Sequence, residues 1–169
     1  MKEAYFAGGC FWCITPAFRS LDGVQRVLSG YSGGEEASPT YEDVKHQRTG
    51  HRETIRVTYD EAVVSFARLT ALFLEQTDPF DDGGQFIDRG HSYTLAVYVN
   101  DEEEKETVCR QLAALERTAG KPVFVAVEPF RAFWRAEEYH QDYDRKNPEA
   151  FAEELETSGR NARDRKKQG

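Results

Sequence analysis

Apolar and polar positions alternate along this chain with two periods, and the changes between the periods predict its elements. A period of two indicates strands, and a period near 3.6 indicates helices. Strands are expected at residues 2–7, 24–31, 53–59, 93–99 and 123–127. Helices are expected at residues 10–21, 65–76, 102–118 and 137–143, with a surface helix after Pro148.

The order of these elements is β-α-β-β-α-β-α-β, with loops inserted. Strands mixed with helices in this way predict an α+β fold. We expect a two-layer α/β sandwich with a mixed sheet and a ferredoxin-like core. Residues 1–155 are expected to form a single domain, and residues 156–169 a basic, flexible C-terminal tail. Residues 78–90 contain Pro79 and three glycines, so a long loop is expected there.

Charge and hydropathy narrow the class of protein. The net charge of −8 argues against a general nucleic-acid binder. Five basic residues fall in the last ten positions: Arg160, Arg163, Arg165, Lys166 and Lys167. A solvated tail is favoured for them over a nucleic-acid arm. No run approaches the roughly 18 apolar residues of a membrane helix, and the first residues lack the apolar core of a signal peptide. A soluble, cytoplasmic monomer is expected.

The cysteines carry the first chemical signal. Cys10 follows a predicted strand and two glycines and opens a predicted helix. Free N–H groups at a helix start stabilise a thiolate, so a lowered pKa is expected for Cys10. Cys13 lies three residues on, at a Cα distance of roughly 5 Å in a helix, within the usual disulfide range. Cys109 falls within an amphipathic helix and is read as a half-buried apolar residue.

Other roles for two cysteines in a C-x-x-C spacing remain open at this point. A structural zinc site needs four ligands, and His46, His51, His91 and His140 have no metal-ligand spacing, so no metal is expected. A thioredoxin-like thiol–disulfide oxidoreductase and a non-catalytic redox-sensing module are the alternatives. The two residues between the cysteines are the large aromatics of the sequence GGCFWC, which favours a pocket for a small apolar group.

Five segments together resemble one family. The chain is similar to the peptide-methionine (S)-S-oxide reductases, the A-type methionine sulfoxide reductases, and within them to a GCFWC variant. The segments that carry the resemblance are FAGGCFWC, GYSGGEEASPTYEDV, TGHRETIRVTYD, QFIDRGHSYTLAVY and AEEYHQDYDRKNP.

The resemblance implies an enzyme that reduces methionine S-sulfoxide, free and in proteins, and thereby repairs oxidised proteins. It places the catalytic thiol on Cys10, the carboxylic acid on Glu53 and the pocket aromatics for the sulfoxide methyl on Phe11 and Trp12. The two tyrosines near the sulfoxide oxygen correspond to Tyr41 and Tyr93, and the aspartate to Asp88.

The expected cycle needs no bound cofactor. Cys10 attacks the sulfoxide sulfur, Glu53 protonates the oxygen, and methionine leaves a sulfenic acid on Cys10. Many members keep recycling cysteines in a C-terminal tail, but this tail has none. Cys13 is therefore the expected resolving thiol, and an external dithiol such as thioredoxin is expected to reduce the Cys10–Cys13 disulfide.

Overall fold

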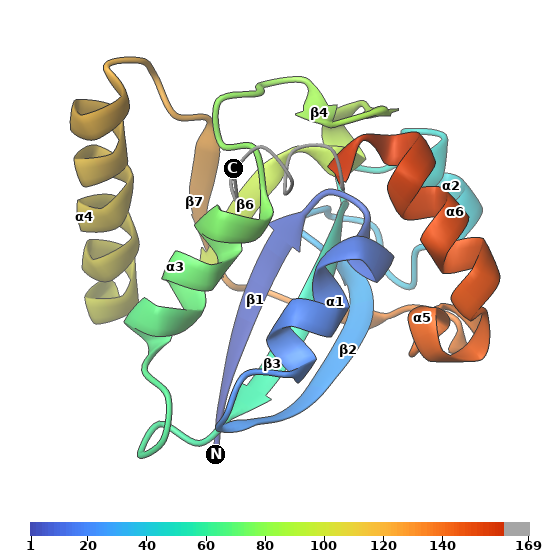
Figure 1. Ribbon diagram of the computed structural model, residues 1–169, viewed down its shortest axis with the longest axis horizontal. Helices are drawn as coiled ribbons and strands as arrows, with labels where there is room; N and C mark the ends of the chain where they lie inside the picture. The colour runs from blue at the N-terminus through green and yellow to red at the C-terminus, as the bar shows by residue number, and fades with distance from the viewer. Residues whose placement is uncertain (161–169) are drawn as a thin grey trace.

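The structure, a computed structural model, describes residues 1–160 and is built on one large sheet (Figure 1). The strands of this sheet run in the order β7-β6-β1-β3-β2-β8. They are β1 (Lys2–Gly8), β2 (Val24–Ser32), β3 (Arg52–Tyr59), β6 (Leu95–Val99), β7 (Val125–Pro129) and β8 (Trp134–Arg135). A separate small hairpin pairs β4 (Gly84–Gln85) with β5 (Asp88–Arg89).

Three of the helices described cover one face of the sheet. Figure 1 shows α1 and α3 in front of the sheet, and α4 beyond α3 beside β6 and β7. The helices are α1 (Phe11–Arg19), α2 (Tyr41–Lys45), α3 (Phe66–Gln76), α4 (Glu102–Ala119), α5 (Tyr143–Lys146) and α6 (Pro148–Ser158). Two 3-10 turns, His91–Tyr93 and Glu138–His140, complete the regular structure described.

The sheet is mixed, as the sequence predicts. β6 and β7 are parallel, whereas the other pairs are antiparallel. The segment from β1 to β6 contains a β-α-β-β-α-β unit whose four strands lie in the order β6-β1-β3-β2. This order is the ferredoxin-like arrangement, so the predicted α+β class and core are confirmed.

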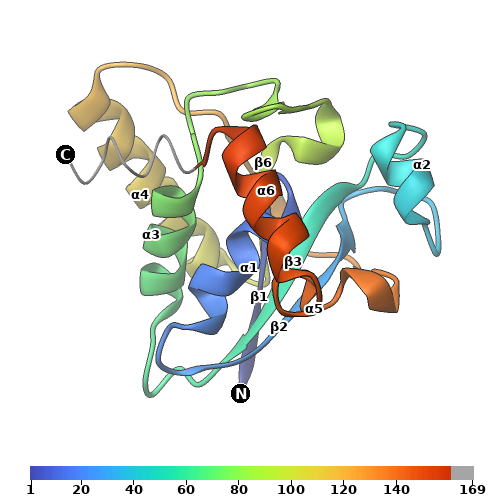
Figure 2. The ribbon, with the colours of Figure 1, turned by 45° about the vertical axis from the view of Figure 1, so that its right-hand side comes forward.

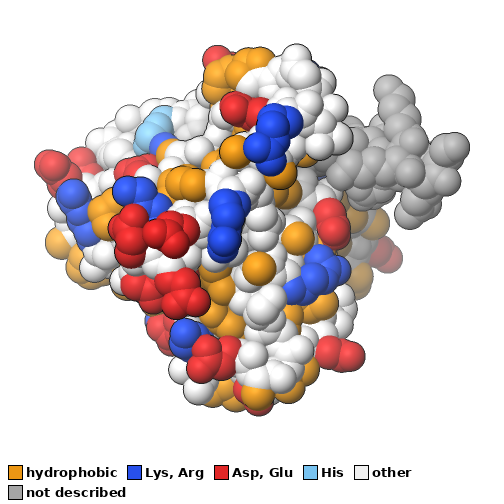
Figure 3. Space-filling model, turned by 90° about the vertical axis from the view of Figure 1, so that its left-hand side faces the viewer, with side chains coloured by type: hydrophobic (Ala, Val, Ile, Leu, Met, Phe, Trp, Pro, Cys, Tyr) orange, Lys and Arg blue, Asp and Glu red, His pale blue; other side chains and the backbone are white. Residues whose placement is uncertain are grey.

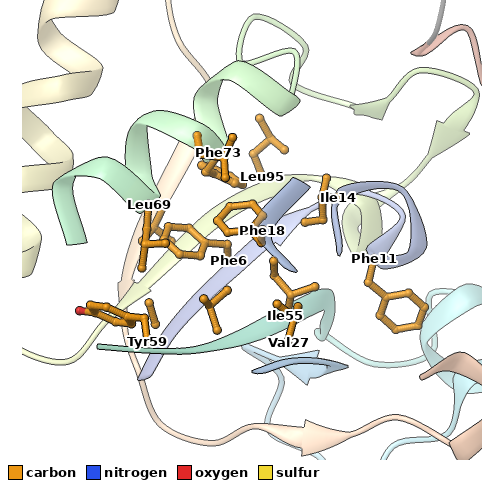
Figure 4. Close-up of a cluster of buried hydrophobic side chains, with 14 of the residues drawn as sticks. Phe6, Phe11, Ile14, Phe18, Val27, Ile55, Tyr59, Leu69, Phe73 and Leu95 are labelled. Atoms are coloured by element: carbon orange, nitrogen blue, oxygen red, sulfur yellow. The ribbon is translucent and has the colours of Figure 1, made fainter. Parts of the chain in front are cut away.

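The main core lies between the helices and the sheet. Figure 4 shows Phe6 of β1 and Phe18 of α1 meeting Leu69 and Phe73 of α3. All four side chains are fully buried, and each such burial stabilises the fold by roughly 1.5–3 kcal/mol. Phe11 lies apart from this group, at the N-terminal end of α1 (Figure 4).

The opposite face of the sheet is covered by an irregular segment rather than by helices. Tyr5 of β1 stacks on Phe130 with ring centres 3.8 Å apart, and Phe133 packs beside them. The two-layer description therefore holds for the helices and the sheet, with a short stretch of chain closing the second face.

Three local expectations differ from the structure. Tyr93 ends a 3-10 turn, and strand β6 begins only at Leu95. The helix expected at 137–143 is a 3-10 turn followed by α5. The expected loop at 78–90 contains the β4–β5 hairpin. Elements of two to four residues leave too few positions for a period to be recognised.

The surface is charged and mixed in sign. Figure 3 shows acidic, basic and apolar side chains interspersed on the face that it presents. No helix within residues 1–160 combines the length and apolar character that a membrane crossing requires. Of the flexible basic tail expected at residues 156–169, positions 156–158 belong to α6 instead. Residues 161–169 lie outside those that the structure describes.

Candidate active site

Antiparallel strand pairing brings the candidate catalytic residues together at one end of the sheet. β1 runs antiparallel to both β3 and β6, so the end of β1 lies beside the starts of its two neighbours. Gly8 pairs with Leu95, just after Tyr93, and Phe6 pairs with Ile55, just after Glu53 and Thr54. Cys10, Glu53 and Tyr93 therefore meet although they are far apart in sequence.

The turn before Cys10 depends on glycine. Gly9 has a φ of +83°, a left-handed conformation that L side chains rarely adopt. A Cβ on Gly9 would lie 2.7 Å from Cβ of Gln85 and 3.0 Å from Nη2 of Arg160. The two glycines thus let β1 turn sharply into α1 beneath two packed side chains.

Six of the eight residues that the sequence predicts for the site line one small pocket. They are Cys10, Trp12, Tyr41, Glu53, Asp88 and Tyr93, and Glu154 of α6 is the seventh lining residue. Figure 2 shows α6 standing beside the N-terminal end of α1. The pocket volume is about 30 Å³, which is the space of about one water molecule.

Cys10 and Cys13 are both buried free thiols, with exposed fractions of 6% and 9%. The N–H of Cys13 donates a 3.1 Å bond to the carbonyl of Cys10, which places both in the first turn of α1. The hydrogen bond between the two side chains and then burial raise the pKa of Cys10 well above its usual value. The same bond, and next the positive charge of Arg160, lower the pKa of Cys13.

The expected lowering of the Cys10 pKa by the helix start is therefore wrong for the resting pair. Cys10 occupies the N-cap position but makes no side-chain capping bond. The first free N–H of α1, on Phe11, points instead to Oε1 of Glu53 at 3.3 Å. Of the two thiols, Cys13 therefore loses its proton more readily.

Glu53 is a carboxyl group enclosed by the protein. It is 2% exposed, and burial raises its pKa to about 8 even though the Phe11 N–H opposes the shift. A carboxyl group with this pKa keeps its proton at neutral pH. The pocket therefore places a proton donor beside the Cys10 thiol.

Two tyrosine hydroxyls of the pocket keep their protons as well. Burial raises the pKa of Tyr41 and of Tyr93 above the ordinary tyrosine range, so both hydroxyls can donate hydrogen bonds. Asp88 lies on β5, and burial and the neighbouring Glu154 raise the pKa of its carboxyl. The hairpin, expected to be a loop, thus brings the Asp88 carboxyl group to the same pocket as Glu53.

Trp12 is held in place from two sides. Its indole N–H donates a 3.1 Å bond to Nδ1 of His140, and its ring stacks on Tyr143 at 3.9 Å. Burial lowers the pKa of His140 to about 4, so its ring is neutral and can accept this bond. His140 thus fixes the position of Trp12 in the pocket wall.

Phe11 does not line the pocket. Its ring is 1% exposed and lies behind the wall, with ring centres 5.9 Å from Tyr31 and 5.2 Å from His140. Its backbone N–H, rather than its ring, reaches the carboxyl group of Glu53.

Sequence reasoning missed three charged residues at the site. Glu137 accepts bonds from the Tyr31 hydroxyl at 2.9 Å and the Tyr41 N–H at 3.0 Å, which fixes the start of α2. Glu154 lines the pocket. Arg160 was assigned to the solvated tail, and this is wrong because it is 5% exposed. Glu137 belongs to the AEEYHQ segment, but no periodic signal marks the other two.

Cys109 lies on the exposed surface of α4, away from this pocket. The half-buried apolar position expected for it is therefore wrong. Among residues 1–160, no three His, Cys, Asp or Glu side chains are grouped so that they could hold a metal ion.

Comparisons with known proteins give the family. The sequence model described as peptide methionine sulfoxide reductase matches residues 2–169. MsrA of Leuconostoc mesenteroides is 43% identical over 157 residues, which cover 92% of each chain. MsrA of Halalkalibacterium halodurans is 42% identical over 162 residues, covering 95% of this chain and 92% of the relative.

Solved structures agree with the sequence comparisons. Reduced Mxr1 from Saccharomyces cerevisiae superposes with a TM-score of 0.81 at 28% identity, covering 88% of this chain and 86% of Mxr1. Methionine sulfoxide reductase A of Corynebacterium diphtheriae gives 0.79 at 28% identity, covering 87% and 75%. Mxr1 in complex with Trx2 shares the fold, with a TM-score of 0.58 at 21% identity. The chain therefore belongs to the peptide methionine sulfoxide reductase family and is an enzyme that reduces methionine sulfoxide.

Proposed function

We propose that this enzyme reduces the S epimer of methionine sulfoxide, free and in proteins, with Cys10 as the nucleophile and Glu53 as the acid. One observation carries the proposal: a buried thiol and a carboxyl group with a pKa of about 8 line the same small pocket. Sulfoxide reduction needs a nucleophile for sulfur and a proton for oxygen at the same moment, and this pair supplies both.

In the first step the sulfur of Cys10 attacks the sulfoxide sulfur as Glu53 protonates the oxygen. Glu53 takes up the proton that the Cys10 thiol loses as it gives its own proton to the sulfoxide oxygen. Oxygen moves to Cys10, which becomes a sulfenic acid, and methionine leaves with its sulfur reduced by two electrons. General acid assistance of this kind contributes about 10²–10⁴-fold to a rate.

The other lining groups orient the substrate. Tyr41 and Tyr93 donate hydrogen bonds to the sulfoxide oxygen, and Asp88 supports them from the hairpin. Trp12 contacts the sulfoxide methyl, and Phe11 supports Trp12 from behind.

In the second half of the cycle, Cys13 attacks the sulfenic acid on Cys10 and water leaves. Sulfenic acids condense with nearby thiols in this way. A thioredoxin-class dithiol then reduces the disulfide, and Mxr1, which has been solved with Trx2 bound, offers a precedent. No bound cofactor is needed, and this scheme makes Cys109 dispensable.

The proposal is tested by supplying each epimer of methionine sulfoxide with a dithiol reductant and measuring methionine. Wild type is expected to reduce the S epimer and to leave the R epimer unchanged, and Cys10→Ser is expected to be inactive. Turnover by Cys10→Ser would contradict the assignment of the nucleophile. Reduction of protein disulfides without any methionine formation would favour the thiol–disulfide oxidoreductase instead.

A further inference from the structure

Arg160 lies after α6 and is fastened to the strand that leads to the nucleophile. Its guanidinium donates from Nη2 to the carbonyl of Gly8 and from Nη1 to the carbonyl of Gln76, both at 3.2 Å. Gly8 ends β1, and Gln76 ends α3. A residue 150 positions beyond Cys10 in the sequence thus joins the catalytic turn to a neighbouring helix.

The charge of Arg160 is buried without a carboxylate partner in the described part of the chain. None of the ion pairs within residues 1–160 includes Arg160. Its Nε has no hydrogen-bond partner there, and its guanidinium carbon lies 4.5 Å from the ring centre of Phe86. A cation in such surroundings is stabilised by any negative charge that forms nearby.

The cysteine pair begins two residues after the Gly8 carbonyl that Arg160 holds. Cys13 is 9% exposed and shares the first turn of α1 with Cys10. Nη2 of Arg160 lies against the Gly8–Gly9 turn, where a Cβ on Gly9 would be only 3.0 Å away. Arg160 is among the groups that lower the pKa of Cys13.

Charged and titratable groups face Cys13 from several elements, and Glu53 of β3 is one of them. The Cys10 thiol favours the Cys13 thiolate through their hydrogen bond, whereas Asp88 of β5 and Glu154 of α6 oppose it. Arg160 is the cation among them, and it also lowers the pKa of Asp88. Without Arg160, the two carboxylates would leave a Cys13 thiolate without a positive neighbour in this set.

We propose that Arg160 is a positioning residue for the resolving step, holding the Gly8–Gly9 turn and stabilising the Cys13 thiolate as it attacks the sulfenic acid on Cys10. This inference rests on the proposed function, because it takes Cys13 as the resolving thiol. It adds Arg160, at the end of the described chain, to the residues that serve the reaction.

The step balances without a further reactant. An electron pair on the Cys13 sulfur forms the S–S bond while the S–O bond of the sulfenic acid breaks. The oxygen leaves as water after taking up the proton that Cys13 gave up. The Cys10 sulfur is reduced by one electron and the Cys13 sulfur is oxidised by one, so the exchange is internal to the pair.

The experiment separates the two half-reactions in Arg160→Gln. One equivalent of methionine S-sulfoxide is mixed with reduced enzyme without a reductant, and methionine and free thiols are followed by rapid quench between about pH 6 and 9. We expect methionine to form within about threefold of the wild-type rate. Disulfide formation is expected to slow about tenfold near neutral pH and to recover about one pH unit higher, because a tenfold change corresponds to one pKa unit.

Arg160→Lys and Arg68→Gln are the matched controls. Arg160→Lys keeps the charge and is expected to retain the wild-type pH profile, and Arg68→Gln removes an exposed charge from α3 and is expected to change neither rate. An equal, pH-independent loss in both half-reactions of Arg160→Gln would reduce Arg160 to a structural clamp and overturn the proposal. An unchanged disulfide rate would overturn it as well.

A measurement on the native Arg160 covers the case in which its variants do not fold. In Cys109→Ser, which keeps Cys10, the alkylation rate of Cys13 is measured against pH, and peptide fragmentation identifies the alkylated cysteine. A midpoint below the free-cysteine value of about 8.5 is expected, and a midpoint at or above it would contradict the proposal. If wild type forms no methionine at all, the proposed function fails instead, so the two failures are distinguishable.

Discussion

The backbone N–H of Phe11 donates a 3.3 Å hydrogen bond to Oε1 of Glu53, which joins the first turn of α1 to the start of β3. This bond places the carboxyl group at the helix start that sequence reasoning reserved for the Cys10 thiolate. The pKa of Glu53 still reaches about 8, because burial outweighs the bond. The N–H at the start of α1 therefore orients the Glu53 carboxyl group. The pKa values of the two thiols depend instead on the hydrogen bond between them and, for Cys13, on Arg160.

The methionine-forming step should follow the protonation of Glu53. Because the pKa of Glu53 is about 8, the rate of this step in wild type is expected to fall as the pH rises through that value. Glu53→Gln is expected to slow the step by about 10²–10⁴-fold and to lack this alkaline limb. Single-turnover methionine formation as a function of pH measures both effects. A full wild-type rate in Glu53→Gln would remove the carboxyl group from the mechanism.

Glu53 should also make stability depend on pH, and the sign follows from its raised pKa. The folded protein keeps the proton up to about pH 8, whereas the unfolded chain loses it near the model value of 4.5. The free energy of unfolding is therefore expected to fall as the pH rises between these values, by at most roughly 1.4 kcal/mol per pH unit. Denaturant unfolding of Glu53→Gln is expected to lack this slope. If the free energy of unfolding depended on pH equally in wild type and in Glu53→Gln, the raised pKa of Glu53 would be contradicted.

Gly9 and Gly120 form a matched pair of positive-φ glycines. A Cβ on Gly9 would lie 2.7 Å from Gln85, whereas a Cβ on Gly120 would meet nothing within 4 Å. Gly120→Ala is expected to cost about 1 kcal/mol of stability from its backbone conformation alone. Gly9→Ala is expected to cost more and to slow methionine formation, as thermal unfolding and single-turnover assays would measure. Equal costs for the two variants would argue against the tight turn.

His140 should make the stability of the protein depend on pH in the acid range, and it should affect substrate binding through Trp12. Its pKa is lowered from 6.5 to about 4, so the unfolded chain binds a proton that the folded protein excludes in this window. Stability is expected to fall as the pH drops through these values. His140→Phe is expected to remove this loss and, because the Trp12 N–H loses its acceptor, to raise KM. His46→Ala, at an exposed position, is the control. An unchanged KM in His140→Phe would show that the hydrogen bond between Trp12 and His140 does not contribute to substrate binding.

The sequence predicts the frame better than the site. Long periodic segments such as residues 53–59 and 102–118 become β3 and α4 nearly as expected, because their burial patterns repeat over many positions. The resemblance carried by five segments predicts site residues that line one pocket in the structure: Cys10, Glu53, Tyr41, Tyr93 and Asp88. It does not reach Arg160, whose burial depends on contacts with Gly8 and Gln76. Long-range contacts of this kind leave no local pattern.

The thiol chemistry shows the same limit. A helix N-terminus predicts a lowered pKa for Cys10, but the neighbouring thiol and burial reverse the shift. Which of two hydrogen-bonded thiols holds the charge is set by the groups around the pair. Those groups, Arg160, Asp88 and Glu154, come from distant parts of the chain.

The central claim is that Cys10 is oxidised by the sulfoxide and resolved by Cys13. The most direct measurement is the mass of the protein after one equivalent of methionine S-sulfoxide without reductant, followed by digestion. We expect a loss of two hydrogens in the peptide that contains Cys10 and Cys13, with Cys109 still free, and a lasting sulfenic acid on Cys10 in Cys13→Ser. A disulfide that includes Cys109, or no change at Cys10 while methionine is released, would contradict the account.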